Sequence, residues 1–206
     1  ALQMKLEIKC PLKAARFGMM FAQLKSFADQ IVMRPDKDGV SMQCMDSSQV
    51  CLFDARLSAG WFDSFEFKDG DPASLGIVPR VLSVALAARK DDQHITISVQ
   101  PEEDFVLVNI HGDAGQLDKL FRVQLLDVEA EVLDLTDPED SQVDLTMDTK
   151  KVAELVAQLG MFDSQVDIGF MDDFISMESR GDEGGLSVKV TLDDVVEYAT
   201  AGQMTQ

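Results

Sequence analysis

The side chains of this sequence that are best suited to act on a ligand are its cations. The chain carries 37 acidic and 18 basic residues, a formal net charge of −19 at pH 7. Even so, no acid occurs between Leu12 and Ala28 or between Ile77 and Lys90. Eight cations fall on or at the ends of three predicted helices: Lys13, Arg16, Lys25, Arg80, Arg89, Lys90, Lys150 and Lys151. Cationic helices in an otherwise acidic chain are suited to contact one polyanion through its phosphates, without reading a base sequence.

The same cations have a second interpretation, as the solvated sides of ordinary amphipathic helices whose basic ends complement the helix dipole. Asp148 and Glu154 flank the lysines of the third segment, which is therefore less distinctly basic than the other two. The sequence contains no aromatic stacking platform and no arginine-rich reading helix. It therefore predicts no base-specific recognition.

The sequence offers little for catalysis or metal binding. Some acid pairs could in principle hold a metal ion, but they lie in turn-like stretches where solvated charges are common; examples are Asp91-Asp92, Glu102-Glu103, Asp172-Asp173 and Asp193-Asp194. His94 and His111 are isolated, and no nucleophile elbow, phosphate loop or HExxH pattern occurs. Cys10, Cys44 and Cys51 are odd in number and lack paired spacing, which argues against a disulfide framework or a zinc site. We predict no enzyme activity, no cofactor and no metal.

The elements that would position the cations follow a repeated order. Alternating apolar and polar residues predict a strand over residues 2–9, and Phe17, Phe21 and Leu24 predict a helix over residues 12–28. The following strands are predicted at residues 30–34, 40–45 and 49–57. The order restarts with a strand at 62–67, a helix at 78–88 and strands at 95–99, 105–110 and 119–125. It restarts again with a strand at 143–147, a helix at 149–159 and strands at 165–170, 174–179 and 186–192. The polar tail over residues 197–206 predicts no strand.

The third unit also echoes the first in sequence. Val40-Ser41-Met42 matches Ile175-Ser176-Met177 at a shift of 135 positions. Three strand–helix–strands units predict an α+β fold of antiparallel sheets, each backed by one helix. Two such units can share a helix pair over one sheet layer, so three units leave one helix without a partner. The segment over residues 126–141 is rich in acids and has no lysine or arginine. We predict an N-terminal domain over residues 1–125, an acidic connector over 126–141 and an incomplete second domain over 142–206.

Several stretches resemble a known family. Residues 39–50 read GVSMQCMDSSQV, and Met45-Asp46-Ser47-Ser48 within them resembles a signature of the proliferating cell nuclear antigen family of DNA sliding clamps. Phe121-Arg122-Val123 resembles the end of the family's first domain, and Asp134-Leu135 resembles the connector of its archaeal members. Residues 185–192 resemble the strand that meets a neighbouring subunit. The resemblance covers nearly the whole chain in order, and it ends before the last helix and strands of the family's second domain.

The resemblance implies the DNA-clamp fold, a trimeric ring with helices lining the hole and antiparallel sheets outside. A basic bore could then coexist with an acidic outer surface, and the eight cations would face double-stranded DNA. Through short peptide motifs the family implies further partners in replication and repair: DNA polymerase, clamp loader, flap endonuclease and ligase. It implies a location at replication sites inside the cell, in the nucleus if the protein is eukaryotic or viral, or in the cytoplasm or nucleoid if it is archaeal. No apolar run is long enough to span a membrane.

The same matching places two contact surfaces. A pocket for partner peptides would comprise four residues of the first domain and three of the connector: Met45, Gln49, Val50, Leu52, Leu133, Asp134 and Leu135. A subunit contact would join the strand at 119–125 to the strand at 186–192 of the next copy, through Phe121, Val123, Leu186, Val188 and Val190. For Met45, Val50 and Leu52 the alternative is ordinary core packing.

Two departures from the family pattern bear on the pocket. Gln49 stands where eukaryotic members carry histidine, and Thr136 replaces a proline of the connector. A second function also stays open, that of a clamp-like interaction protein, a decoy or an assembly subunit, that does not encircle DNA. The missing fourth unit favours this alternative.

Overall fold

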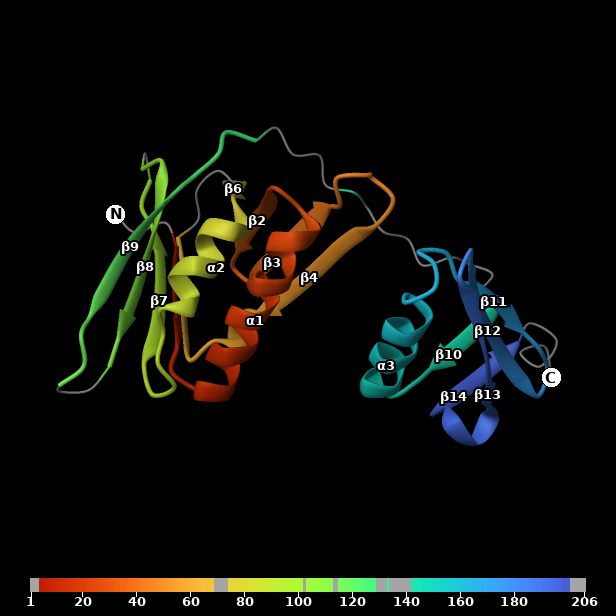
Figure 1. Ribbon diagram of the computed structural model, residues 1–206. Helices are drawn as coiled ribbons and strands as arrows, with labels where there is room; N and C mark the ends of the chain where they lie inside the picture. Colours follow the sequence, from red (N-terminus) through yellow and green to blue (C-terminus); the bar gives the residue numbers. More distant parts are fainter. Residues whose placement is uncertain are drawn as a thin grey trace. The chain divides into compact units, whose positions relative to one another are not determined.

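The computed structural model describes residues 4–68, 74–101, 103–112, 115–128, 133 and 142–200. The chain forms two compact units, Ala1–Leu133 and Asp134–Gln206 (Figure 1). Most of the predicted connector lies outside the described residues, so the predicted domain limits stay a prediction. Among the described residues, no helix has the length and apolar character needed to cross a membrane.

Two antiparallel sheets build the first unit. One sheet has the strand order β5-β1-β7-β8-β9 and comprises Ser64–Phe67, Met4–Ile8, His94–Val99, Phe105–His111 and Lys119–Gln124. The other has the order β4-β3-β2-β6 and comprises Leu52–Ser58, Gly39–Met45, Ile31–Asp36 and Leu75–Ile77. Side chains alternate between buried and accessible along most of these strands, as expected for sheets with one covered face.

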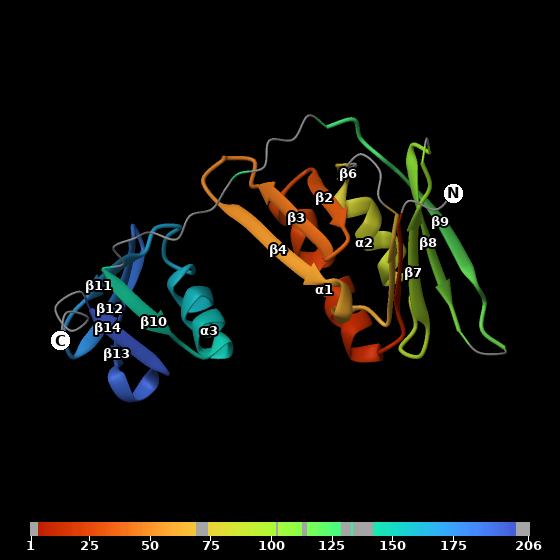
Figure 2. The ribbon, with the colours of Figure 1, turned by 180° about the vertical axis from the view of Figure 1, so that it is seen from behind.

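Two helices cover the apolar faces of both sheets. Helix α1 (Pro11–Phe27) and helix α2 (Pro79–Ala87) each begin at a proline, which has no backbone N–H to leave unsatisfied in a first turn. They pack against each other and lie side by side in both views of the ribbon (Figure 2). Phe21 of α1 and Leu82 of α2 are almost completely buried in one core that both sheets share. The predicted helices are therefore confirmed to within one residue at either end.

The start of α1 is held by a residue from far along the chain. The backbone N–H groups of Lys9 and Cys10 donate to Asp63 Oδ2 at 2.7 and 3.2 Å, while Asp63 N donates to the carbonyl of Glu7 at 2.9 Å. Cys10, the N-cap residue, makes no side-chain capping bond of its own. The N–H donors of Lys9 and then Cys10 hold the pKa of Asp63 below its ordinary value. One carboxylate thus joins the end of β1, the start of α1 and the approach to β5.

The second unit repeats the order of the first. It comprises β10 (Val143–Thr146), α3 (Thr149–Leu159), β11 (Asp167–Phe170), β12 (Phe174–Gly181), β13 (Gly184–Thr191) and β14 (Glu197–Thr200). The sheet β11-β12-β13 corresponds to β2-β3-β4. In both, a serine hydroxyl of the middle strand donates to a carbonyl of the first: Ser41 Oγ to Arg34 O at 3.3 Å, and Ser176 Oγ to Gly169 O at 3.4 Å. The predicted repeat and the predicted α+β class are confirmed.

Two strands depart from the prediction. The polar tail was predicted to hold no strand, and this is wrong, because β14 pairs with β10 and places Tyr198 opposite Leu145. The Tyr198 hydroxyl donates to the carbonyl of Met171 at 2.7 Å, so an aromatic residue anchors a short strand whose other side chains give no alternation signal. Strand β6 was also missed, because it is only three residues long.

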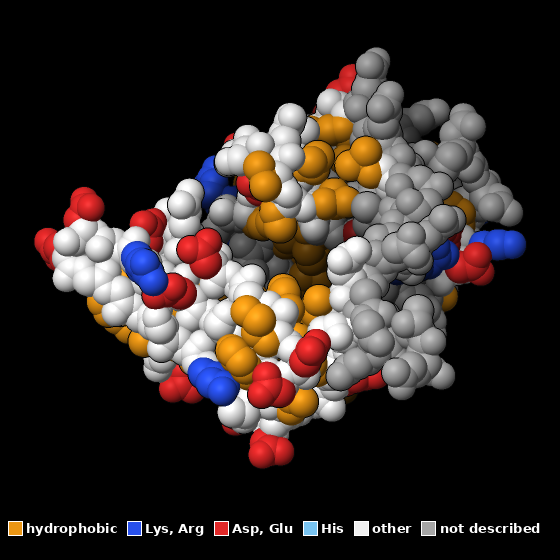
Figure 3. Space-filling model, turned by 90° about the vertical axis from the view of Figure 1, so that its right-hand side faces the viewer, with side chains coloured by type: hydrophobic (Ala, Val, Ile, Leu, Met, Phe, Trp, Pro, Cys, Tyr) orange, Lys and Arg blue, Asp and Glu red, His pale blue; other side chains and the backbone are white. Residues whose placement is uncertain are grey.

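Helix α3 has no second helix packed against it among the described residues. Asp148 caps its start by accepting N–H groups from Lys150 and Lys151 at 3.0 and 3.2 Å. Its residue Leu159 is buried, whereas Val152 and Val156 are exposed. Other hydrophobic side chains of this unit are also exposed, as the face in Figure 3 shows. The prediction that the third helix would lack a partner stays a prediction.

Replacing Asp63 by alanine tests the junction at the start of α1. We expect the melting temperature at pH 7 to fall by about 2–4 °C, because two backbone N–H groups lose their acceptor. Since the folded-state pKa of Asp63 is lowered, this stabilisation is present above the unfolded pKa near about 4 and is lost as the pH falls through the folded value. The control is Glu66→Ala, an exposed acid of β5. Equal melting temperatures for the two variants at pH 7 would contradict the assignment.

Candidate functional site

The loop between β3 and β4 is organised around one carboxylate. Asp46 Oδ1 accepts the backbone N–H groups of Val50 and Cys51, each at 2.8 Å, and Oδ2 accepts that of Ser48 at 3.3 Å. Asp46 N donates to the carbonyl of Cys51 at 3.0 Å and closes the loop. These donors, Cys51 first, hold the pKa of Asp46 below its ordinary value. The loop delays the start of β4 to Leu52, three residues later than predicted.

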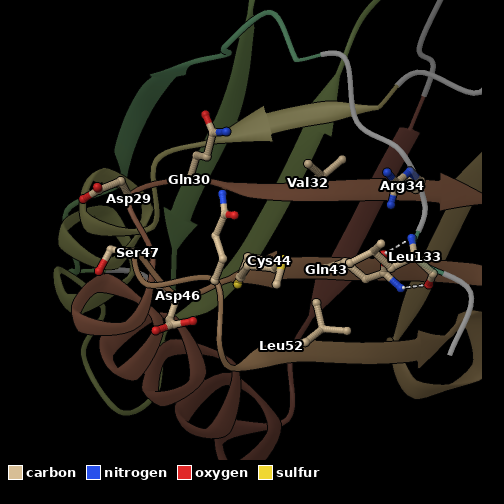
Figure 4. A pocket seen from close by; sticks show the side chains of 12 residues that line it. Asp29, Gln30, Val32, Arg34, Gln43, Cys44, Asp46, Ser47, Leu52 and Leu133 are labelled. Carbon is tan, nitrogen blue, oxygen red and sulfur yellow. Dashed lines mark hydrogen bonds between the residues drawn. The ribbon is translucent and has the colours of Figure 1, made fainter.

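An open groove of about 1000 Å³ lies beside this loop, on the side of β2, β3 and β4 that faces away from the core (Figure 4). Val32 and Leu52 bring apolar surface to it, and Arg34 brings a cation. Its twelve lining residues come from the three strands, their loops and the connector: Asp29, Gln30, Val32, Arg34, Gln43, Cys44, Met45, Asp46, Ser47, Gln49, Leu52 and Leu133. Seven of the twelve lining residues are polar and five are apolar, so the groove offers apolar surface for the anchors of a peptide and polar groups that can orient it.

Four of the seven predicted pocket residues line this groove: Met45, Gln49, Leu52 and Leu133. Met45 and Val50 are exposed, so neither is a core residue, although Val50 does not line the groove. Gln49 stands at the loop tip with a φ of 57°, in the left-handed region. The predicted pocket residues Asp134 and Leu135 lie outside the described residues. The role of these residues in binding stays a prediction.

Sequence reasoning missed three lining residues that are central to the groove: Val32, Arg34 and Gln43. A signal for them was present, because strand alternation buries Ile31 and Met33 and so directs Val32 and Arg34 outward. Gln43 lies opposite Val32 on β2 and opposite Asp54 on β4, in the middle of the three-stranded surface. Its side chain contacts the connector, and no sequence pattern indicates that contact.

Gln43 makes three hydrogen bonds through its side-chain amide. Nε2 donates to Leu133 O at 2.9 Å and to Asp54 Oδ2 at 2.6 Å. Leu133 N donates to Oε1 at 3.2 Å. Dashed lines in Figure 4 mark the two bonds to Leu133. The groove is therefore joined to the connector through both backbone groups of a single residue.

The predicted DNA-facing cations are divided between the two units. Arg16, Lys25, Arg80 and Lys90 are exposed in the first unit, and Lys150 is exposed on α3 of the second. The three others already have partners within the chain. Lys13 Nζ donates to Trp61 O at 2.5 Å, Arg89 Nη1 donates to three backbone carbonyls between residues 90 and 93, and Lys151 pairs with Asp194 at 3.2 Å. The contact of these eight cations with DNA stays a prediction.

The two strands predicted to join subunits are both edge strands. β9 ends the five-stranded sheet, and β13 ends the sheet β11-β12-β13. Phe121, Leu186 and Val188 are half-buried, whereas Val123 and Val190 are buried within their own units. Any pairing between copies would therefore use the backbone of these strands and the half-buried side chains. The predicted interface remains a prediction.

The described residues contain no cluster of three or more histidine, cysteine or acidic side chains that could hold a metal ion. His94 and His111 face each other across β7 and β8, with ring centroids 5.6 Å apart, and His111 Nε2 hydrogen-bonds Thr96 Oγ1 at 2.9 Å. Of the acid pairs considered above, Asp194 accepts hydrogen bonds from Thr191 Oγ1 and Lys151 Nζ. These contacts give both groups ordinary structural roles.

Residues 6–134 match the family described as proliferating cell nuclear antigen, N-terminal domain. The chain belongs to this family. Among curated proteins it is similar to the DNA polymerase sliding clamps of Pyrococcus furiosus and Thermococcus gammatolerans. It is 29% identical to the first over 186 residues and to the second over 182, and in each case the match covers 88% of this chain and 70% of the relative. Members of the proliferating cell nuclear antigen family are processivity factors, so the chain is not an enzyme.

Two solved structures share the fold. Proliferating cellular nuclear antigen from Entamoeba histolytica gives a TM-score of 0.84 at 22% identity, covering 97% of this chain and 78% of that one. The homologue from Thermococcus kodakaraensis gives 0.82 at 15% identity, covering 96% and 77%. The predicted DNA-clamp fold is therefore confirmed, and at these identities the likeness concerns the fold alone.

Replacing Asp46 by alanine tests how the loop beside the groove is held. We expect the amide hydrogens of Val50 and Cys51 to exchange roughly tenfold faster at pH 7, because their charged acceptor is lost. Since the folded-state pKa of Asp46 is lowered, the protection should persist above about pH 4 and disappear as the pH falls through the folded value. Ser47→Ala, a change at an exposed residue of the same loop, is the control. Unaltered exchange in the Asp46 variant would rule out this account of the loop.

Proposed function

We propose that the chain is a subunit of a DNA sliding clamp. Copies would assemble head to tail into a trimeric ring that encircles double-stranded DNA, holds DNA polymerase on its template and recruits other replication and repair proteins. The observation that carries this proposal is that each unit has, among the described residues, an edge strand with a helix against it: β9 in the first unit and β13 in the second. Such a clamp acts at replication sites inside the cell.

The outer edges of β9 and β13 are built alike but belong to different units. Helix α2 lies against β9, and helix α3 lies against β13. Each helix exposes two valines: Val81 and Val84 are 38% and 63% exposed, and Val152 and Val156 are 40% and 62% exposed. An open strand edge with apolar side chains beside it favours pairing with another chain. Joining the β9 edge of one copy to the β13 edge of the next is a heterologous contact, which makes a ring when the rotation between copies closes.

The distribution of charge supports the DNA-encircling part of the proposal. Helices α1 and α2 contain no acid and expose Arg16, Lys25 and Arg80. The rest of the first unit and the second unit carry most of the 37 acids of the chain, which repel phosphates. A few cations per copy suit weak contacts that let DNA slide. A closed ring keeps such a protein on DNA by linkage, so tight binding is unnecessary.

The groove beside the β3–β4 loop supports the recruitment of partners. Val32 and Leu52 provide apolar surface for hydrophobic and aromatic anchors of a short peptide, and the connector provides a backbone edge at Leu133. The relatives are named DNA polymerase sliding clamps, and by analogy the partners would be DNA polymerase, clamp loader, flap endonuclease and ligase. Such partners would share one short motif and compete for the groove.

A second candidate function is that of a clamp-like interaction protein, a decoy or an assembly subunit that does not encircle DNA. The observation that favours it is that three of the eight candidate DNA-facing cations, Lys13, Arg89 and Lys151, already have partners within the chain. This alternative predicts a monomer, or a complex with a different chain. The mass of the protein in solution therefore distinguishes the two functions.

A mixing experiment tests the head-to-tail contact. Val84→Glu blocks the α2 edge, and Val156→Glu blocks the α3 edge, because each places a charge on an apolar contact. We expect the unaltered protein to have three times the 22.7 kDa mass of one chain, and each variant alone to be a monomer. An equimolar mixture should stop at two chains, since only one functional pair of edges remains.

Light scattering after size exclusion gives these masses. The matched control is Val50→Glu, a change at an exposed valine of the β3–β4 loop that should leave the trimer intact. Unaltered protein that stays monomeric at high concentration would refute the ring, and a mixture with the mass of one chain would refute the head-to-tail contact.

Removing two exposed cations tests the DNA-facing surface. The double variant Arg16→Ala, Arg80→Ala should lower clamp-stimulated DNA synthesis about three- to tenfold at physiological salt, because fewer phosphate contacts remain. Its mass in solution should be unchanged. Arg56→Ala serves as the control, because Arg56 is exposed on β4 and pairs with Asp36 at 3.3 Å. Equal stimulation by the double variant and the control would show that α1 and α2 do not face DNA.

A further inference from the structure

Gln43 contacts Leu133 in the way that one residue of a β-strand contacts its neighbour. Its amide nitrogen donates to Leu133 O at 2.9 Å, and its amide oxygen accepts from Leu133 N at 3.2 Å. A residue of a strand pairs with its neighbour through these same two bonds. The Gln43 side chain on β3 therefore makes the two hydrogen bonds that the backbone of an additional strand would make. Gln43 and Leu133 are 90 residues apart in sequence.

The hydrogen bond to Asp54 sets the orientation of the Gln43 side-chain amide. Gln43 and Asp54 face each other across β3 and β4, and Gln43 Nε2 donates to Asp54 Oδ2 at 2.6 Å. An ionised carboxylate accepts hydrogen bonds and cannot donate them, so it selects the nitrogen end of the amide. Both N–H groups of Nε2 then have acceptors, and Oε1 is left facing the N–H of Leu133. If the amide were flipped, Gln43 Oε1 would face Asp54 Oδ2, which would place two acceptors together. Gln43 Nε2 would then face Leu133 N, which would place two donors together.

This arrangement has a consequence for a strand that binds at the groove. The N–H and C=O groups of Leu133 are both already bonded to Gln43. A peptide strand that adds to the connector must therefore pair with backbone groups other than those of Leu133. It also meets Leu133 already held in place by Gln43, which lowers the entropy lost on binding.

We propose that Gln43 is a positioning residue for partner binding, which fastens the connector beside the groove at Leu133 and is itself oriented by Asp54. The proposal rests on the proposed function, because it assigns the groove to a partner peptide. Gln43 acts through the connector, and Asp54 acts only through Gln43.

Amide hydrogen exchange of Leu133, measured by NMR on the full chain, tests the fastening alone. Gln43→Leu keeps a similar size without the hydrogen bonds, and we expect Leu133 to exchange about fivefold to tenfold faster. Asp54→Ala should give a smaller increase. The double variant should match Gln43→Leu, because Asp54 has no route to Leu133 except through Gln43.

The matched control is Ser41→Ala, a change two residues earlier on the same strand, where the hydroxyl donates to Arg34 O. It should leave the exchange of Leu133 unchanged, and all variants should keep the denaturation midpoint of the unaltered protein. Unchanged exchange in Gln43→Leu, or additive effects in the double variant, would overturn the proposal. An equal increase in Ser41→Ala would also overturn it, because the effect would then be a general loosening of the sheet.

Calorimetry with a synthetic clamp-interacting peptide that carries hydrophobic and aromatic anchors tests the positioning role. We expect Gln43→Leu to raise the Kd about threefold to tenfold and Ser41→Ala to leave it unchanged. Faster exchange of Leu133 with an unchanged Kd would overturn the positioning role. If the unaltered protein binds no peptide, the assignment of the groove to partners fails, and the exchange data still decide separately whether Gln43 holds Leu133.

Discussion

An antiparallel sheet with one apolar face has to cover that face, and the architecture of this chain follows from how it does so. In the first unit, α1 and α2 lie together over two sheets, and Phe21 and Leu82 are buried in one core that extends across both. In the second unit, α3 covers its sheet without a second helix among the described residues, and Val152 and Val156 remain exposed. Among the described residues, two helices therefore cover the sheets of the first unit and one helix covers those of the second. Exposed apolar surface of this kind often marks a site that binds another protein.

The position of charge follows from the same layering. Because the helices cover one face of the sheets, the opposite face and the loops carry most of the acids, while α1 and α2 carry none. A net charge of −19 therefore does not exclude contact with a polyanion, since the field at a surface depends on nearby charges within about 10 Å. Several of the cations are also structural. Arg89 binds carbonyls at the end of α2, and Lys13 donates to Trp61 O, so a charge count overstates what is free to bind.

Much of the fold could be predicted from sequence, because its strong signals are local. Pro11 and Pro79 mark the starts of two helices, and strand alternation places Ile31 and Met33 in the core. The features that escaped prediction depend on residues distant in sequence. Asp63 accepts hydrogen bonds from the two residues that precede α1, which begins about fifty residues earlier in the chain. Gln43 hydrogen-bonds Leu133, which lies 90 positions away. Short strands such as β6 and β14 carry too few residues for a periodic signal. The resemblance located the groove through Met45 and Leu52, but the contact of Gln43 on β3 with Leu133 became apparent only in the structure.

Ser41 and Ser176 make equivalent hydrogen bonds in sheets of the same strand order, but the hairpins that follow these strands differ. Between β3 and β4 the chain makes the six-residue loop that borders the groove, whereas β12 and β13 are joined by Asp182 and Glu183 alone. This hairpin of the second unit therefore has no counterpart of the loop organised by Asp46. The three-stranded sheet thus occurs in both units, but the six-residue loop beside the groove occurs in the first. If the groove binds partners as proposed, the one such loop among the described residues would give one partner per chain and not one per repeat.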